Sequence, residues 1–151
     1  MDDLLGSSAR LLAALVAGGL IGLNRDMYGK PTGVRVHALV ALGAALLTMT
    51  GGVLADPGAT SRIIQGIVGG IGFLGAGVIM HDSAGKRALH LVTAASIWMT
   101  AALGVACGSG AWKLAALAAV ATLIVLGVGL QIDLALYRRL TPKNDDGDTP
   151  S

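Results

Sequence analysis

The sequence holds few charged residues, few aromatic residues, no glutamate and a single cysteine. Charged residues make up 13% of the 151 positions, whereas a soluble domain typically carries about 25%. So few charges cannot cover a water-exposed surface. Disorder is excluded as well, because it requires low hydrophobicity and high charge. Cys107 has no second cysteine to pair with, which excludes a disulfide framework and a cysteine-rich zinc site.

Hydrophobic residues, which make up 54% of the chain, gather in five long runs. A helix needs about 20 apolar residues to cross the ~30 Å hydrocarbon core of a bilayer. Inside lipid every backbone N–H and C=O group must be bonded within the protein, and the runs lack the alternation of barrel strands. We therefore predict an all-α, polytopic membrane helix bundle with about five transmembrane helices. The expected spans cover approximately residues 4–23, 36–55, 63–80, 89–106 and 112–136.

The basic residues between these spans predict the orientation of the chain. With five spans, the loops after the first and third spans lie on the same side as the C-terminus. Eight Lys and Arg residues fall on that side, and three fall on the other. Because basic loops stay in the cytoplasm, we expect the N-terminus outside and the C-terminus inside. Residues 1–140 form the predicted transmembrane domain, and residues 141–151 are expected to be a short disordered cytoplasmic tail.

The third span contains Gly70, Gly72 and Gly75 in the spacing of the dinucleotide-binding fingerprint G-x-G-x-x-G. That fingerprint requires a preceding strand, a tight turn and an acidic residue about 20 positions later. Here the glycines lie within an apolar helix, and Ala94 and Ala95 follow at that distance. Nucleotide binding is therefore not expected.

Close helix packing explains these glycines better. At about 100° per residue, Gly66, Gly69, Gly70 and Gly77 fall on one smooth face, and bulky residues fall on another. Helices in lipid associate by close backbone contact across small residues, as in the G-x-x-x-G pattern, which also occurs in the first and fourth spans. A broken helix that lines a substrate site is the alternative. The expected helix-packing positions are Gly18, Gly22, Gly66, Gly70, Gly72, Gly75, Gly77, Gly104 and Gly108.

Arg25, Arg35 and His37 flank the loop between the first and second spans. Two interpretations stay open. These residues set the orientation and contact anionic lipid headgroups, or they form a basic cluster that binds a lipid phosphate, an anionic ligand or a partner, which suits the planar donor fork of Arg. An ionisable group inside a span needs a partner, and Asp26 is the nearest candidate for His37.

On the opposite side, Arg62 opens the glycine-rich span, and Asp56 is placed to pair with it across a short loop. Gln65 lies about one helical turn further in. Arg62 is therefore either an interfacial anchor or, together with Gln65, a polar mouth above the packing groove.

Metal binding and catalysis find little support in the sequence. His81, Asp82 and His90 supply too few ligands for Mg²⁺ and no fixed geometry for zinc. The sequence has no phosphate loop, metalloprotease motif or basic-aromatic pattern typical of nucleic-acid binding. We therefore expect no metal, no cofactor, no catalytic residue and no nucleic-acid partner.

Four motifs, in order, resemble those of the MgtC/SapB family. The first, Glu-Arg after the first span, appears as Asn24-Arg25, and the second, Gly-x-Arg-Thr-His-x-Leu-Val, runs from Gly33 to Val40. The third, an Arg and then Gly-Ile-Gly-Phe-Leu-Gly-Ala-Gly, is intact as Arg62 and residues 70–77. The fourth, Gly-Leu-Thr-Thr-Ala-Ala-Ser-x-Trp, covers residues 90–98. The departures from the family pattern are Asn24, Val36, His90 and Val92.

The resemblance implies a multi-pass protein of the bacterial inner membrane that is linked to magnesium limitation or stress. Longer members of the family continue into a soluble cytoplasmic domain. We expect a non-enzymatic, regulatory protein whose partners are membrane lipids, other inner-membrane proteins or a second copy of the chain. The alternative is a small, magnesium-related transporter of ions or solutes.

Overall fold

The computed structural model describes residues 2–54, 56–80 and 87–140, and these residues form five α-helices. Each helix contains a segment of 19 to 24 residues that is long and apolar enough to cross a membrane. The all-α prediction is therefore confirmed. The helices are α1 (Asp2–Met27), α2 (Val34–Val53), α3 (Ala59–Met80), α4 (Arg87–Gly108) and α5 (Trp112–Leu140).

Some sequence predictions fall outside the described residues. The expected disordered tail lies there, as do His81 and Asp82. So do Lys86 and Lys143, two of the basic residues on which the predicted orientation rests.

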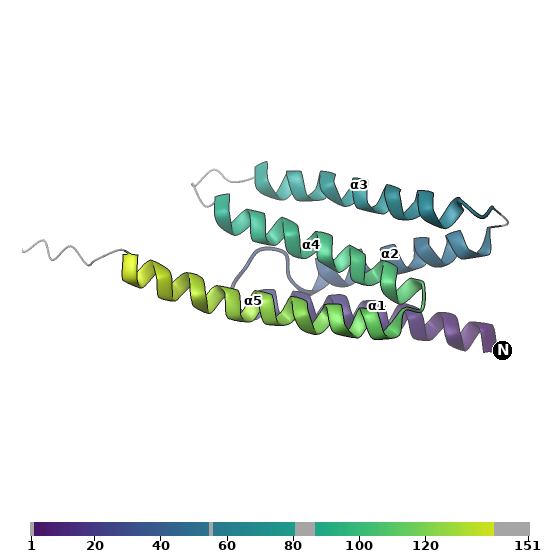
Figure 1. Cartoon of the computed structure of the whole chain (residues 1–151), viewed down its shortest axis with the longest axis horizontal. Helices are drawn as coiled ribbons and strands as arrows, with labels where there is room; N and C mark the ends of the chain where they lie inside the picture. The colour runs from purple at the N-terminus through teal and green to yellow at the C-terminus, as the bar shows by residue number, and fades with distance from the viewer. Residues whose placement is uncertain (1, 55, 81–86, 141–151) are drawn as a thin grey trace, which may run out of the picture.

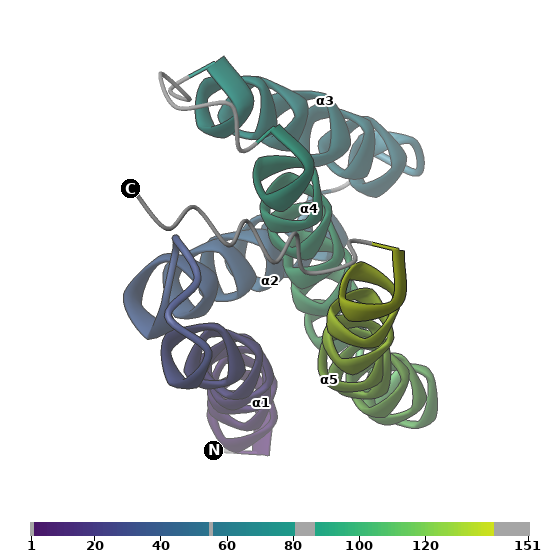
Figure 2. The same ribbon diagram turned by 90° about the vertical axis from the view of Figure 1, so that its left-hand side faces the viewer.

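The helices α2 and α4 form the centre of the bundle. α2 packs against α1, α3 and α4, whereas α4 contacts all four other helices. The end view in Figure 2 shows α3 on one side of this central pair and α1 and α5 on the other. The five helices run roughly along the long axis of the molecule (Figure 1). α3 and α5 consequently bury little of their surface within the chain.

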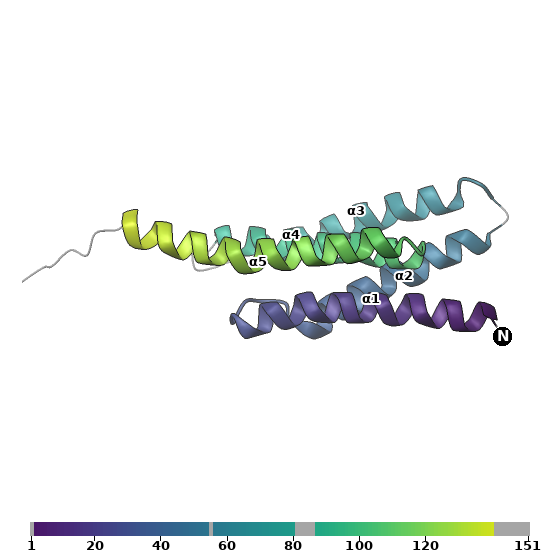
Figure 3. The same ribbon diagram turned by 60° about the horizontal axis from the view of Figure 1, so that its bottom comes forward.

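The ends of the helices alternate between the two ends of the bundle. In Figure 3 the start of α1, the end of α2 and the start of α3 lie at one end, and the last turn of α5 lies at the other. The α1–α2 loop lies at the same end as the last turn of α5. This agrees with the alternation assumed for the orientation, although which end faces the cytoplasm remains a prediction.

The loop between α1 and α2 is short and bonded at both sides. Gly29 has a positive φ of 59°, a conformation that glycine adopts without steric cost. The carboxylate of Asp26 accepts a hydrogen bond from the backbone N–H of Val34 at 3.0 Å. This bond satisfies one of the free N–H groups at the start of α2. The loop thereby sets α1 and α2 side by side as an antiparallel pair.

The core of the bundle is built from small side chains. One buried cluster lies where α1, α2, α4 and α5 meet, and most of the large apolar side chains lie outside it, exposed on the helix surfaces. Exposed Leu, Val and Ile side chains suit a protein that is surrounded by lipid chains. The buried cluster consists of Ala14, Ala41, Ala45, Cys107 and Ala115.

Candidate functional site

The helices α1 and α4 approach α2 so closely that only glycine fits between them. A Cβ atom at Gly18 of α1 would lie 2.5 Å from the carbonyl oxygen of His37 and 2.8 Å from the Cβ of Ala41. A Cβ atom at Gly104 of α4 would overlap the carbonyl oxygen of Ala41. Ala41 therefore contacts a glycine on each side, and α2 is held between two backbones.

Gly22 and Gly108 extend these two contacts by one turn. A Cβ atom at Gly22 would lie 2.5 Å from the Cα of Val34, and one at Gly108 would lie 2.6 Å from the carbonyl oxygen of Ala45. α2 thus fills the G-x-x-x-G grooves of both α1 and α4. These two grooves serve the fold of the single chain and are not free to receive a partner.

The glycines of α3 lie in open space. A Cβ atom at Gly66, Gly70, Gly72 or Gly77 would meet no other described residue within 4 Å, and all four positions are exposed. Gly75 differs, because it is buried and its Cβ would lie 3.4 Å from the Cβ of Ala94, an ordinary contact. The glycine face of α3, which we define as Gly66, Gly69, Gly70 and Gly77, is therefore uncovered in the single chain.

Two apolar grooves border the glycine face of α3. The first has a volume of about 350 Å³, and its walls include Gly66 and Gly70 of α3 and Leu47 of α2. The second has a volume of about 420 Å³ and is lined in part by Phe73 and Gly77. The surface beside the glycines is thus hollowed and apolar.

Four polar residues meet inside the bundle where α1, α2 and α4 come together, and we call Arg25, His37, Thr93 and Ser96 the polar junction. Arg25 is 4% exposed, and its Nη2 donates a hydrogen bond to the hydroxyl oxygen of Thr93. His37 is fully buried. Its Nδ1 donates to the carbonyl oxygen of Gly33 at 3.1 Å, and its Nε2 lies 3.2 Å from the hydroxyl oxygen of Ser96. These bonds link three helices in the buried interior, where unpaired polar groups are costly.

The expected basic cluster is divided in the structure. Arg25 and His37 belong to the polar junction, whereas Arg35 is exposed and lines a separate surface hollow together with Asp26. Asp26 is not the hydrogen-bond partner of His37, because its carboxylate instead binds the first N–H group of α2. The charged and polar residues that flank the α1–α2 loop therefore lie in two separate places.

The sequence did not predict that Thr93 and Ser96 would pair with Arg25 and His37. A signal was present, since Thr93, Ser96 and Thr100 are spaced three and four residues apart and so share one face of α4. All three are buried. A stripe of hydroxyl groups on one face of an apolar helix predicts an inward orientation, but not which helix supplies the partner.

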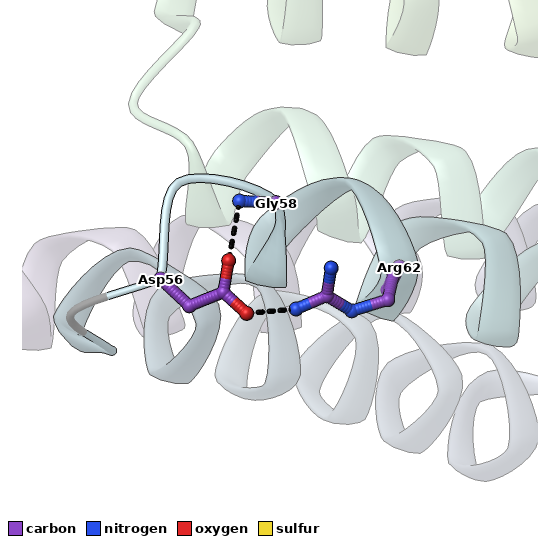
Figure 4. Close-up of polar contacts among 3 residues, drawn as sticks. All are labelled: Asp56, Gly58 and Arg62. Carbon is purple, nitrogen blue, oxygen red and sulfur yellow. Dashed lines mark hydrogen bonds and ion pairs between the residues drawn. The ribbon is translucent and has the colours of Figure 1, made fainter.

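Arg62 and Asp56 form the ion pair that the sequence predicted (Figure 4). The other carboxylate oxygen of Asp56 accepts a hydrogen bond from the N–H of Gly58 at 2.8 Å. Both charged side chains are more than half exposed, at 63% for Arg62 and 54% for Asp56. Such a pair contributes at most about 1 kcal/mol. Gln65 lies on the same helix and is exposed.

Within residues 2–54, 56–80 and 87–140, no three His, Cys or Asp side chains are grouped closely enough to hold a metal ion.

The five long apolar helices define a multi-pass membrane protein. Residues 11–133 match the MgtC family, and the chain belongs to this family. The resemblance inferred from the four sequence motifs is thereby confirmed.

The chain is similar to several named proteins. The chain is 43% identical over 136 residues to protein SrpB of Synechococcus elongatus, covering 82% of this chain and 75% of the relative. It is 42% identical over 128 residues to protein MgtC of Salmonella typhimurium, covering 85% of this chain and 53% of the relative. Identity to protein MgtC of Brucella abortus is 40% over 122 residues, with coverages of 81% and 49%. The chain thus spans about half the length of the MgtC relatives, and no solved structure matches it.

Proposed function

We propose that this chain is a non-enzymatic regulatory protein of the bacterial inner membrane, which acts by binding another membrane helix on the glycine face of α3. The helix belongs to a second copy of the chain or to a different inner-membrane protein. The response that it serves is magnesium limitation or stress, as the family resemblance implies. The N-terminus faces outward and the C-terminus faces the cytoplasm.

The single observation that carries this proposal is the contrast among the three glycine-rich helices. In α1 and α4 the glycines face the backbone of α2 at distances that no side chain tolerates. In α3 the same spacing of glycines faces open space beside an apolar groove. Apolar burial does not drive helices together in lipid, so close contact across small residues is the main source of affinity there. An uncovered glycine face therefore favours a helix from outside the chain.

The glycine density of α3 supports the same conclusion. In water, each glycine in a helix costs about 1 kcal/mol relative to alanine. Four of them on one exposed face bring no benefit to the isolated chain, because nothing described lies within 4 Å of a Cβ at these positions. A contact that forms only in the assembled complex gives these residues a role.

The proposal is tested by replacing Gly70 or Gly77 with leucine in the full chain and crosslinking the protein in bacterial membranes. A leucine side chain fills the groove without disturbing the rest of the chain, so the amount of crosslinked complex recovered in mild detergent is expected to fall by about ten-fold. Growth in magnesium-poor medium of a bacterial strain that lacks the gene for this protein tests the physiological part. Both variants are expected to fail to restore that growth.

The matched control is Gly19→Leu in α1. A Cβ at Gly19 also meets nothing within 4 Å, but this residue lies outside the glycine face of α3. The control is expected to form complexes in wild-type amounts. Full recovery of crosslinked complexes from both Gly70→Leu and Gly77→Leu would contradict the proposal.

A second candidate function, transport of a small ion or solute, is favoured by the buried hydroxyl groups of α2 and α4. Thr48 and Thr100 are both buried. Their hydroxyl groups, however, donate to the carbonyl oxygens of Ala44 and Ser96 in their own helices, each at 2.8 Å. These groups are therefore satisfied locally and are poorly placed to coordinate a passing ion. A saturable flux of Mg²⁺ into liposomes that contain the purified protein would reverse this ranking.

A further inference from the structure

A cavity between α1, α4 and α5 combines a buried positive charge with an apolar wall. Its volume is about 180 Å³, which is ample for a phosphate group, because a water molecule takes about 30 Å³ of liquid. The polar side of the cavity is formed by residues at the end of α1 and in the loop that follows. These residues are Asn24, Arg25, Tyr28 and Lys30.

The polar side of the cavity offers hydrogen-bond donors and two positive charges. Arg25 and Lys30 are cations, and the amide of Asn24 and the hydroxyl of Tyr28 can both donate. None of the described residues that line the cavity carries a carboxylate. The donor set therefore suits an oxyanion, and the fork of Arg together with the point charge of Lys suits a phosphate group in particular.

Arg25 is incompletely satisfied, although it is almost fully buried. One of its terminal nitrogens donates to Thr93, but its Nε has no hydrogen-bond partner among the described residues. No described carboxylate lies within ion-pair distance of its guanidinium group, since the described ion pair is that of Arg62 and Asp56. A buried cation without a counter-charge is costly. An anion in the cavity that Arg25 lines would supply that charge.

The opposite wall of the cavity consists of apolar residues of α4 and α5. Val125 and Gly129 belong to this wall, and Val125 is 69% exposed. The wall thus continues onto the outer surface of α5, where hydrocarbon chains of the bilayer lie. A ligand that carries a phosphate group and an acyl chain matches both halves of the cavity.

We propose that this cavity binds the phosphate group of an anionic phospholipid, with Arg25 and Lys30 on the phosphate and the acyl chain along α5. This site lies on the opposite side of the central helices from the glycine face of α3 (Figure 2). A test of this lipid site is therefore independent of a test of the proposed partner contact.

The test measures lipid binding to the full chain in mild detergent by native mass spectrometry. Phosphatidylglycerol and phosphatidylcholine with identical acyl chains are titrated separately. The anionic lipid is expected to bind at least about five-fold more tightly, which is the effect of one basic residue near a membrane surface. Equal affinity for the two lipids would overturn the proposal.

Two variants locate the binding, and neither disturbs the link between Arg25 and Thr93. Gly129→Leu fills the cavity from α5, where a Cβ meets nothing within 4 Å, and it is expected to weaken phosphatidylglycerol binding about ten-fold. Lys30→Gln is expected to weaken it about five-fold. The matched controls are Gly127→Leu on the same helix and Lys113→Gln at the opposite end of the bundle. An unchanged affinity in Gly129→Leu relative to Gly127→Leu would refute the site.

Inorganic phosphate distinguishes a lipid from a soluble phosphate ligand. If millimolar phosphate displaces the lipid from the wild-type chain but not from Lys30→Gln, the cavity also accepts free phosphate compounds. Lipid binding that resists phosphate would show that the acyl chain along α5 is required. Both results support a phosphate site, whereas binding of neither ligand to the wild-type chain would contradict it.

Discussion

Replacing Gly104 with alanine is expected to destabilise the bundle, although alanine is the better helix former. The new Cβ atom would overlap the carbonyl oxygen of Ala41 and lie 2.8 Å from the Cβ of Ala44, so α2 and α4 must move apart. Overpacking of this kind costs about 1–3 kcal/mol, and the gain in helix propensity offsets about 1 kcal/mol of it. Because the obstructing oxygen belongs to the backbone and cannot rotate away, we expect a net loss of about 1–2 kcal/mol.

The single cysteine provides the assay for this prediction. Cys107 is 2% exposed and lies in the cluster of small residues at the centre of the bundle. Its reaction with a thiol-specific fluorophore therefore reports unfolding of the detergent-solubilised chain on heating. A loss of about 1–2 kcal/mol lowers the midpoint by about 2–8 °C for a chain of this size.

Gly127→Ala is the matched control on α5. A Cβ at Gly127 meets nothing within 4 Å, so this variant gains helix propensity without a clash. Its midpoint is expected to equal or exceed that of the wild type. The same chemical change thus has opposite effects at the two sites. A Gly104→Ala variant that unfolds at or above the temperature of Gly127→Ala would refute the close packing of α4 on α2.

Three further predictions concern the polar groups and the orientation. Ser96→Ala removes the hydroxyl that faces His37 and is expected to cost about 0.6–1.7 kcal/mol, the range for hydrogen bonds between membrane helices. Its control is Ser109→Ala, which removes an exposed hydroxyl that follows α4 and donates to carbonyl oxygens of its last turn; this variant should leave the unfolding midpoint unchanged. Asp56→Asn breaks an exposed ion pair, so it is expected to lower the free energy of unfolding by less than about 1 kcal/mol, with a smaller effect at high salt. A larger loss that does not depend on salt would contradict the description of this pair as exposed. A green fluorescent protein fused after residue 140 is expected to fluoresce, whereas alkaline phosphatase at the same position should be inactive, and the reverse pattern would contradict the predicted cytoplasmic C-terminus.

The helices themselves were predictable because the bilayer imposes a simple requirement. A backbone in lipid must satisfy its own hydrogen bonds, so each long apolar run becomes a helix. The third span, for example, was expected at residues 63–80 and is observed as Ala59–Met80. Its extra turn contains Arg62, whose charged end lies at the surface with Asp56. The charge of Arg62 in the first turn therefore obscured where the helix begins.

The partners of the polar residues were not predictable to the same degree. Asp26 precedes His37 by eleven positions and was the obvious candidate, yet Ser96 of α4 lies against the ring of His37 instead. A partner on another helix is set by how the helices are arranged, and spacing along the chain carries no information on that arrangement.

The amino-acid sequence by itself determined that this protein is a bundle of membrane-spanning helices of the MgtC type, because apolar length and motif order are properties of the chain alone. It also identified three helices with glycine faces. Only the tertiary structure decided that α1 and α4 direct these faces at α2 while α3 leaves its face uncovered. The physical reason is that helical pitch determines which residues share a face, whereas packing between helices determines what each face meets.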